Sequence, residues 1–247
     1  MTDSQKSDSI ENWRRIMERD PYLQPYASDL QRRAKRFREM EHHLTGGKQS
    51  ISEFASGHEY FGMHFRDGKW IFREWAPNAE AMYLIGDMTD WEIRMPADRL
   101  SHGDIYRLRL HWSGQRGDRI PSYARRVVQD PHTHIFNAQV WHPEHPYQWK
   151  YPDFTVRREP ALVYEAHIGM AQPEEKVGTY REFMDHVLPR VIDSGYNVLQ
   201  FMAIQEHPYY GSFGYQVSNF YAASSRFGTP DDLKALVDAA HAAGLAV

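Results

Sequence analysis

The sequence predicts a multidomain fold of the β plus α/β class, built from three consecutive parts. Three observations predict it. Residues 10–46 repeat apolar residues at helical spacing, residues 60–151 hold short strands without intervening helices, and residues 162–247 alternate strands with capped helices. These patterns indicate a helical segment, a β-sandwich and the opening of a parallel α/β domain. We place the three parts at 1–56, 57–152 and 153–247.

The first part contains one long amphipathic helix. Its apolar residues recur at steps of three and four, namely Leu30, Ala34, Phe37, Met40 and Leu44. This stripe predicts a packed face, which Asp29 caps and Gly46-Gly47 ends. The opposite face is rich in Arg and Lys. We interpret it as a solvated face rather than a nucleic-acid site, because no stacking platform lies near it.

The second part has the pattern of an antiparallel sandwich. Asp67-Gly68 joins two strand-like runs and predicts a two-residue hairpin turn. Turns are also expected at Ser101–Asp104 and at Ser113-Gly114. Further strands are expected at Ala81–Ile85, Ile105–Leu110 and Tyr123–Val128. Several short strands in succession favour a sandwich of about ninety residues.

The third part has the β-α-β-α-β order of a parallel sheet. Strands are expected at Leu162–Ile168, Val198–Ile204 and Leu245–Val247. Thr179 with Glu182 forms a capping box for the first helix, and Thr229 with Pro230 starts the second. The apolar faces of the two helices are expected to run through Phe183, Val187, Leu188, Val191 and Ile192, and through Leu233, Leu236, Val237 and Ala240.

Composition excludes several classes of protein. The chain has 247 residues, no Cys and a formal net charge of −4, which excludes disulfides, Cys-ligated zinc and a globally basic nucleic-acid binder. No apolar run approaches the roughly 18 residues of a membrane helix, and no secretory signal is visible. We therefore expect a cytoplasmic protein without membrane or nucleic-acid partners. Its 7 Trp, 15 Tyr and 12 Phe suit sugar recognition as well as an aromatic core.

Two groups of polar residues invite a catalytic or metal-binding interpretation. Glu165 and Glu206 form a carboxylate pair of the kind that glycoside chemistry uses, but we favour a buried polar network of Glu165 with His167 over direct catalysis. His132 and His134, with His142 and His145 nearby, lack a carboxylate or cysteine at metal-site spacing. We expect ordinary histidines and no metal there.

Two aromatic segments invite a binding interpretation. The loop His207–Gln216 follows the second strand and contains two glycines, three tyrosines and a phenylalanine, so it is either a sugar-stacking loop or a packed rim. In the sandwich, Trp75 stands beside Pro77 and is expected to form a flat platform on an edge strand. Trp91, in the GDMTDW motif, is expected in the core.

The third part contains the motifs VYEAHIG, KVGTYREF, VLPRVIDSGYNVLQFMAI, EHPYYGSFGYQVSNFY and AASSRFGTPDDLKALVDAAHAAGLAV. These motifs resemble the start of the catalytic (β/α)8 TIM barrel of 1,4-alpha-glucan branching enzymes, in the alpha-amylase superfamily. REWAPNAEAMYLIGDMTDWE resembles the immunoglobulin-like carbohydrate-binding module of the same family. The likeness runs from Asp20 to Val247 and is nearest to the eukaryotic form.

The resemblance implies a retaining transfer of α-1,4-glucan segments to a 6-hydroxyl, with an Asp nucleophile, a Glu acid/base and no cofactor. Those carboxylates follow later barrel strands, so none is expected before Val247 and the 247-residue chain is expected to be inactive. The implied partner is glycogen, amylopectin or amylose. The resemblance assigns sugar binding to Tyr215 in the barrel and to Trp75, Ala76, Pro77, Gly47, Lys48, Ser101, His102, Gly103 and Asp104 around the sandwich.

Two other functions stay open at this point. One is a stand-alone glucan-binding or scaffold protein without a catalytic half. The other is an isoamylase-type debranching hydrolase, because the WAPNA and GDMTDW motifs alone would also allow it. The oligomeric state is not indicated by the sequence.

Overall fold

The computed structural model describes residues 13–86, 94–157 and 159–247. It divides into two compact units, Met1–Glu59 and Tyr60–Val247, and each is described here by itself. Trp91, expected in the core, lies outside the described residues. No helix in the described part of the chain has the length and apolar composition to cross a membrane.

The first unit is helical, as its spacing predicts. Residues 13–19 form a helix, the 3-10 helix η1 (Pro21–Tyr26) follows, and it leads directly into α2 (Ala27–Thr45). The helix ends at Gly46 with φ 61°, a left-handed geometry that glycine adopts without strain. The prediction that Asp29 caps this helix is wrong. Asp29 lies in the first turn and Tyr26 is the N-cap, because η1 already supplies the entry into α2.

The apolar stripe of α2 is open in the described structure. Phe37 is 64% exposed, Met40 51% and Leu44 40%. The Arg and Lys side of the helix is solvated as expected, with Arg32 paired to Asp29 at 2.5 Å. Two short helices, α3 (Ile51–Phe54) and α4 (Gly57–Tyr60), then lead to the first strand.

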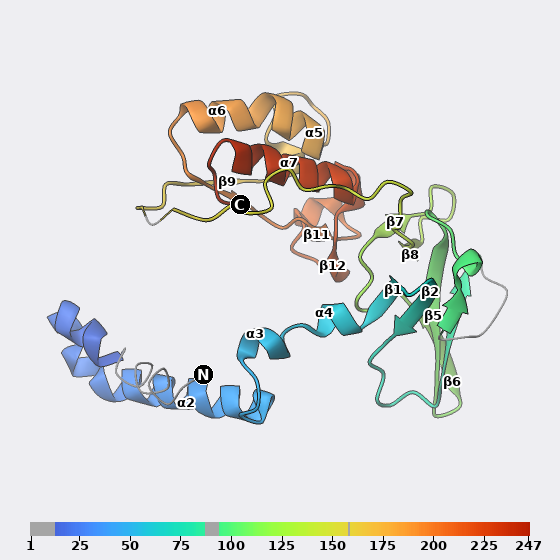
Figure 1. The fold of residues 1–247 in the computed structure, drawn as a ribbon, viewed down its shortest axis with the longest axis horizontal. Helices are drawn as coiled ribbons and strands as arrows, with labels where there is room; N and C mark the ends of the chain where they lie inside the picture. The colour runs from blue at the N-terminus through green and yellow to red at the C-terminus, as the bar shows by residue number, and fades with distance from the viewer. Residues whose placement is uncertain (1–12, 87–93, 158) are drawn as a thin grey trace. The chain divides into compact units, whose positions relative to one another are not determined.

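The sandwich consists of a three-stranded and a five-stranded antiparallel sheet (Figure 1). The first sheet has the order β1-β2-β4, and the second has the order β3-β5-β8-β7 with β6 on β5. The strands are β1 (Gly62–Arg66), β2 (Lys69–Arg73), β3 (Ala81–Gly86), β4 (Arg94–Pro96), β5 (Ile105–Trp112), β6 (Gln115–Arg119), β7 (Val127–Gln129) and β8 (Phe136–Gln139).

Turn chemistry sets the register of these strands. Asp67 and Gly68 both have positive φ, 52° and 70°, so the predicted hairpin turn joins β1 to β2 with Arg66 opposite Lys69. The strand expected at Tyr123–Val128 begins only at Val127. Strands β4, β6 and β8 were not predicted, because their residues are too polar or too few for a clear alternation.

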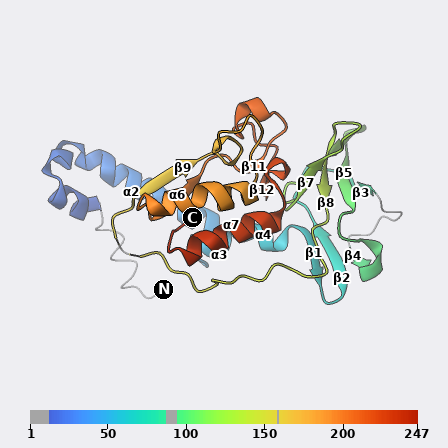
Figure 2. The same ribbon diagram turned by 90° about the horizontal axis from the view of Figure 1, so that it is seen from above.

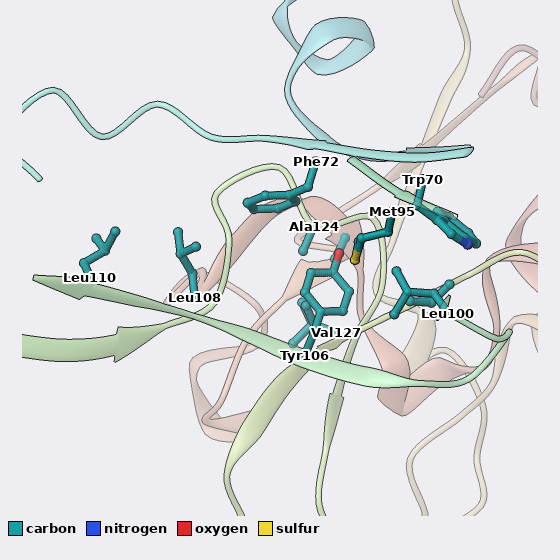
Figure 3. Close-up of a cluster of buried hydrophobic side chains, with 12 residues drawn as sticks. Trp70, Phe72, Met95, Leu100, Tyr106, Leu108, Leu110, Ala124 and Val127 are labelled. Carbon is teal, nitrogen blue, oxygen red and sulfur yellow. The ribbon is translucent and has the colours of Figure 1, made fainter. Parts of the chain in front are cut away.

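The two sheets enclose one apolar core. Figure 3 shows Trp70, Met95 and Leu100 at one end, Phe72 and Tyr106 in the middle, and Leu108 and Leu110 at the other end. Burial alternates along β5, since Tyr106, Leu108 and Leu110 face inward while their neighbours do not.

The third part follows an irregular connector and has parallel strands, as predicted. The β9 strand (Val163–Ala166) pairs in parallel with β10 (Val198–Phe201), and Ala246 bridges in parallel to Val198. Both capping boxes are present, at Thr179 and at Thr229. The second of them opens α7 (Pro230–Ala242).

The first helix of this part is not regular. It divides into α5 (Tyr180–Glu182), a π-helical turn η4 (Phe183–Val187) and α6 (Leu188–Asp193). Pro189 has no N–H to donate, and the Leu188 N–H bonds to Phe183 O, so the ladder widens by one residue just before the proline. Ile192, expected on the inner face, is 36% exposed because of its place near the helix end.

The helices cover one face of this small sheet (Figures 1 and 2). Ala166 and Leu199 of the strands pack with Val191, Leu236 and Ala240 of the helices. The opposite face is bare, because Val163 is 44% exposed and the side chains of Glu165 and Gln200 are also exposed. The β9–β10 sheet therefore has one face covered by helices and one face exposed to solvent.

A hairpin joins this part to the sandwich. It consists of β11 (Gln205–Glu206) and β12 (Asn219–Ala223), and Ala222 belongs to the sandwich core. Asn219 Nδ2 donates to Pro121 O at 3.0 Å, and the Tyr221 ring stacks on Tyr123 at 4.6 Å. These contacts fix the hairpin on the sandwich.

Candidate functional site

An exposed tryptophan follows the last residue of β2. Trp75 is 67% exposed, and Ala76 and Pro77 continue the same loop toward a turn. The expectation of an edge strand is wrong: β2 is the middle strand of its sheet, and Trp75 lies beyond its end. The indole nevertheless offers a flat apolar face to solvent, as the platform interpretation requires.

A buried carboxylate fixes the backbone of this loop. The Glu74 side chain is 0% exposed and accepts the Trp75 N–H at 2.9 Å and the Ser122 N–H at 2.8 Å. Arg119 lies 4.0 Å from the carboxylate and donates to Trp75 O at 3.5 Å. A buried carboxylate held by two amides and a guanidinium keeps the loop in one conformation. Sequence reasoning missed Glu74, although a Glu directly before an exposed Trp was a usable signal.

The turn Ser101–Asp104 forms as predicted but contacts another part of the sandwich. Asp104 Oδ2 accepts the Ser101 N–H at 2.7 Å, and Gly103 has a φ of 98°. The Gly103 N–H donates to Val140 O, while the His102 ring packs edge-on against Trp141 at 4.7 Å. The turn is therefore continuous with the segment that follows β8.

The turn and the tryptophan platform lie at different points along β2. The Trp70 Nε1 donates to Ala97 O, so the start of β2 lies beside the segment that leads into the turn. Trp75 comes five residues later, about 16 Å farther along an extended chain. A single sugar ring cannot touch both, so a common groove would require several glucan units.

Gly47 and Lys48 lie in the first unit, directly after α2. Their backbone amides donate to Thr45, at 3.1 Å to its Oγ1 and 3.2 Å to its O. The φ of Gly47 is 67°, which explains the need for glycine at that position. The sugar-binding role that the resemblance assigns to Gly47 and Lys48 stays a prediction.

The second exposed aromatic site is the loop between β11 and β12. Tyr215 is 68% exposed and Tyr209 63%, whereas Phe213 is 44% exposed and its ring lies edge-on to His167 at 5.9 Å. The loop follows the carboxyl end of β10, the edge at which parallel α/β folds build their sites. The sugar-stacking interpretation is the one that this exposure favours.

The base of that loop is tightly held. Gly214 has a φ of 89°, and a Cβ there would lie 2.0 Å from Ala203 O, so no other residue fits. Phe213 also has a positive φ, 53°, and the Tyr215 N–H donates to Ser212 O at 3.0 Å. Arg226 Nη2 donates to Pro208 O at 2.7 Å. The backbone is ordered while the Tyr215 ring stays in solvent.

Glu206 is a structural carboxylate. It is fully buried and accepts from the backbone N–H of Ser225 at 2.7 Å and of His207 at 3.2 Å. Arg126 lies near enough for its charge to act on Glu206, and it donates to Gly228 O at 2.7 Å. A carboxylate that accepts from backbone amides is unsuited to attack a sugar, so the contacts of Glu206 fit a structural role.

The network expected between Glu165 and His167 is absent from the described residues. Glu165 is exposed on the bare face of the sheet, whereas His167 is 7% exposed, with neither ring nitrogen hydrogen-bonded to another described group. Burial lowers the pKa of His167, the nearby Phe213 backbone opposes this shift in part, and His207 adds to the lowering. The prediction failed because His167 lies after the end of β9, so the two-residue period does not extend to it.

His132 and His134 lie in a turn rather than on a strand. Asp130 accepts the N–H groups of His132 and Thr133 at 2.9 and 2.7 Å, and His134 has a φ of 58°. These bonds lower the pKa of Asp130. Over the described ranges, no group of three or more His, Cys, Asp or Glu side chains could hold a metal ion.

Comparisons with known proteins identify relatives of this chain. Residues 60–132 match the family model of carbohydrate-binding module 48, described as the isoamylase N-terminal domain. The 1,4-alpha-glucan-branching enzyme of Felis catus is 39% identical, with 94% of this chain and 36% of that protein covered. The enzyme of the same name from Aspergillus oryzae is also 39% identical, with 94% and 37% covered. The chain thus spans little more than a third of the length of these curated relatives.

Solved structures show the same fold. A protein of Salmonella typhimurium whose crystal structure is assigned to the alpha amylases is 26% identical, with a TM-score of 0.60 over 75% of this chain and 32% of that one. A pullulanase from Bacillus acidopullulyticus has a TM-score of 0.59 at 16% identity, over 75% and 28% of the two chains, and that likeness concerns the fold alone.

Proposed function

The chain belongs to the family of 1,4-alpha-glucan-branching enzymes, and on that premise we propose that its sandwich binds an α-glucan chain for a glucan-branching protein. The observation that carries the proposal is the Trp75 indole, 67% exposed on a loop that buried Glu74 holds. An aromatic face held in place stacks on a sugar ring with little further loss of entropy. The match to a carbohydrate-binding module over 60–132 supports it.

The proposed reaction of the whole protein is a retaining transfer. A carboxylate attacks the anomeric carbon, the bond to O4 of the next glucose breaks, and a carboxylic acid donates its proton to that O4. A 6-hydroxyl of a glucan then displaces the enzyme carboxylate and gives its proton to the second carboxylate. We assign neither role to a residue up to Val247, because the resemblance places both carboxylates after later barrel strands. The Glu206 carboxylate is also excluded, since it accepts from backbone amides. No cofactor is needed for these steps.

Tyr215 is proposed to stack on the sugar at the bond that is cleaved. Its exposed ring on an ordered loop at the carboxyl end of β10 supports this role. Ala76 and Pro77 are proposed to extend the Trp75 platform, and Ser101, His102, Gly103, Asp104, Gly47 and Lys48 to contact further units of a long glucan. The proposed partners are glycogen, amylopectin and amylose, and the proposed compartment is the cytoplasm.

Affinity electrophoresis in gels with amylopectin tests the binding proposal. We expect the Trp75→Ala variant to lose most of the retardation that the unmodified chain shows, because the stacking face is removed. Trp149→Ala is the matched control, since Trp149 is 45% exposed but lies in the connector. Equal retardation of Trp75→Ala and the unmodified chain would contradict the platform.

An iodine-stain assay tests whether the 247-residue chain binds glucan without branching it. We expect the 247-residue chain to bind amylopectin without branching it, whereas a chain extended to the length of the relatives branches amylose. Tyr215→Ala in the extended chain is expected to lower branching and leave amylopectin retardation unchanged. Branching by the 247-residue chain would contradict the assignment of the catalytic carboxylates to later strands. Release of linear chains by the extended protein would indicate a debranching hydrolase instead, which the curated relatives do not favour.

A further inference from the structure

A pocket of about 180 Å³ lies in the second unit, at the end of the sandwich where β1 turns into β2. We call it the hairpin pocket, and its walls include His64, Phe65, Trp70, Arg125, Trp141 and His142. It is separate from the Trp75 platform, because Trp70 lies near the start of β2 and Trp75 lies beyond its end, about 16 Å farther along an extended chain. Figure 3 shows Trp70 at the end of the core near Leu100, away from Leu110.

Aromatic rings form the apolar walls of the hairpin pocket. The Phe65 ring lies 5.0 Å from Trp70 and 4.8 Å from His142, and Trp70 lies 5.2 Å from His142. Trp70 meets Phe65 and His142 edge to face, and the Phe65 and His142 rings are tilted by 43° to each other. Phe65 is 38% exposed and His142 is also exposed, which leaves the entrance accessible. Such walls suit the C–H face of a pyranose ring.

The polar side chains that line the hairpin pocket carry no negative charge. His64 Nε2 faces Phe61 O at 2.8 Å and must carry the proton, so Nδ1 accepts from Arg125 Nη2 at 3.4 Å. Burial lowers the pKa of His64, the hydrogen bond to Phe61 O opposes this shift, and the positive charge of Arg125 adds to the lowering. The described residues that line the pocket include no Asp or Glu.

These features select the class of ligand. A divalent cation is disfavoured, because a guanidinium and no carboxylate faces the space. An entirely apolar ligand is disfavoured, because His64, Arg125 and Gln139 make part of the pocket wall polar. One sugar ring supplies both an apolar face and several hydroxyl oxygens, and the volume is too small for a longer oligosaccharide.

We propose that the hairpin pocket is a second sugar subsite of the sandwich and takes one pyranose unit of an α-glucan. The inference rests on the proposed glucan binding and adds a separate contact to it. Two contacts on one rigid domain bind a polymer more tightly than either alone, because the second contact forms at high effective concentration. The turn Ser101–Asp104 lies beside the hairpin pocket through His102 and Trp141, so its proposed role belongs with this subsite.

Indole N–H signals in ¹H–¹⁵N NMR spectra of the full 247-residue chain distinguish the two sites. Trp141 and Trp70 report on the hairpin pocket and Trp75 on the platform. On titration with maltotriose we expect both groups of signals to shift. We expect Arg125→Ala to weaken the response of Trp141 by about threefold to tenfold, through loss of a charged donor, and to leave that of Trp75 unchanged. Arg116→Ala, an exposed arginine on β6, is the matched control.

The outcomes separate the two proposals. If Trp75 shifts with maltotriose and Trp141 and Trp70 do not, the second subsite is overturned while glucan binding stands. If no indole shifts with maltotriose or with amylopectin fragments, the proposed function itself fails. If inorganic phosphate shifts Trp141 and maltotriose does not, the hairpin pocket binds anions and the sugar assignment is overturned. The decisive titration uses the unmodified chain, so it does not depend on the folding of a variant.

Discussion

The sandwich and the part that follows it use their apolar residues in different ways. In the sandwich, two sheets close over one core, and Leu108 and Val127 are completely buried between them. In the third part, helices cover one face of β9 and β10, while Val163 on the other face is 44% exposed. The two sheets of the sandwich bury each other's inner faces, whereas the β9–β10 sheet has one buried face and one exposed face.

The difference shows how each part is stabilised. The sandwich depends on apolar burial, at roughly 1.5–3 kcal/mol for each fully buried large side chain. The third part adds polar anchors: Asp238 on α7 accepts from Tyr147 Oη at 2.6 Å and from the Lys150 and Tyr151 amides at 2.9 and 3.2 Å. The Phe154 ring also stacks on His241 at 4.1 Å. These contacts hold the connector against α7, although the described residues of the connector form no strand that could pair with a neighbour.

The largest effect is expected in the sandwich core. Leu108→Ala leaves a cavity between the two sheets and should lower the free energy of unfolding by about 2–5 kcal/mol. Urea denaturation followed by tryptophan fluorescence measures it. A loss below about 1 kcal/mol would mean that the sheets collapse onto the cavity and that the sandwich is less rigid than its burial indicates.

The next effect concerns the polar anchor of the third part. Asp238→Asn removes a buried carboxylate that accepts three hydrogen bonds and should cost about 1–3 kcal/mol. The cost should depend on pH. Burial opposes ionisation of Asp238, but the bonds from Tyr147, Lys150 and Tyr151 outweigh it and lower its pKa.

The sign of that pH dependence follows from the lowered pKa. The unfolded chain binds a proton to Asp238 at higher pH than the folded chain does, so the stabilisation is complete above about pH 4 and is lost as the pH falls further. Unfolding free energies of the unmodified chain and of Asp238→Asn, measured from pH 6 to pH 2 (roughly the range of carboxyl titration), should converge at the acid end. A constant difference across that range would contradict the anchor.

A smaller effect is expected at a helix start. Thr229→Ala removes the side chain that accepts the Asp232 N–H and should cost about 1 kcal/mol. Thr229→Ser keeps the hydroxyl and should restore most of the loss. Thermal unfolding followed by circular dichroism measures both variants. If serine fails to rescue, the packing of the Thr229 methyl group rather than the cap is responsible.

The smallest effect is expected on the bare face of the third part. Val163→Ala should change the free energy of unfolding by less than about 0.5 kcal/mol, because the side chain already contacts solvent. This substitution is the counterpart of Leu108→Ala. If urea denaturation shows that both cost the same, the face is covered in solution, and the contrast between the two parts fails.

Much of the architecture could be predicted from local sequence. Asp67-Gly68, the capping boxes at Thr179 and Thr229, and the parallel order of the third part all formed as expected. Local chemistry decides these features, since a turn or a cap depends on residues within four positions of each other. The π-helical turn before Pro189 could not be predicted, because it depends on how the helix packs on both sides of the proline.

Only some of the site residues could be predicted from the sequence. Sequence reasoning identified Trp75 and Tyr215, and the structure shows both rings exposed on fixed loops. It missed Glu74, whose partner Ser122 is 48 residues away. It also predicted a polar network between Glu165 and His167. The Glu165 side chain is exposed and the His167 side chain is buried, because β9 ends between them.

The sequence by itself determined the order of the three parts, the family to which they belong and the aromatic residues available for sugars. Those properties reside in residue identity and short-range spacing. Only the tertiary structure decided which aromatic rings remain in solvent, that Glu206 is bound to backbone amides, and that Phe65, Trp70 and His142 meet around one pocket. The physical reason is that burial and side-chain contact depend on residues far apart in the chain, whose proximity arises only when the sheets pack.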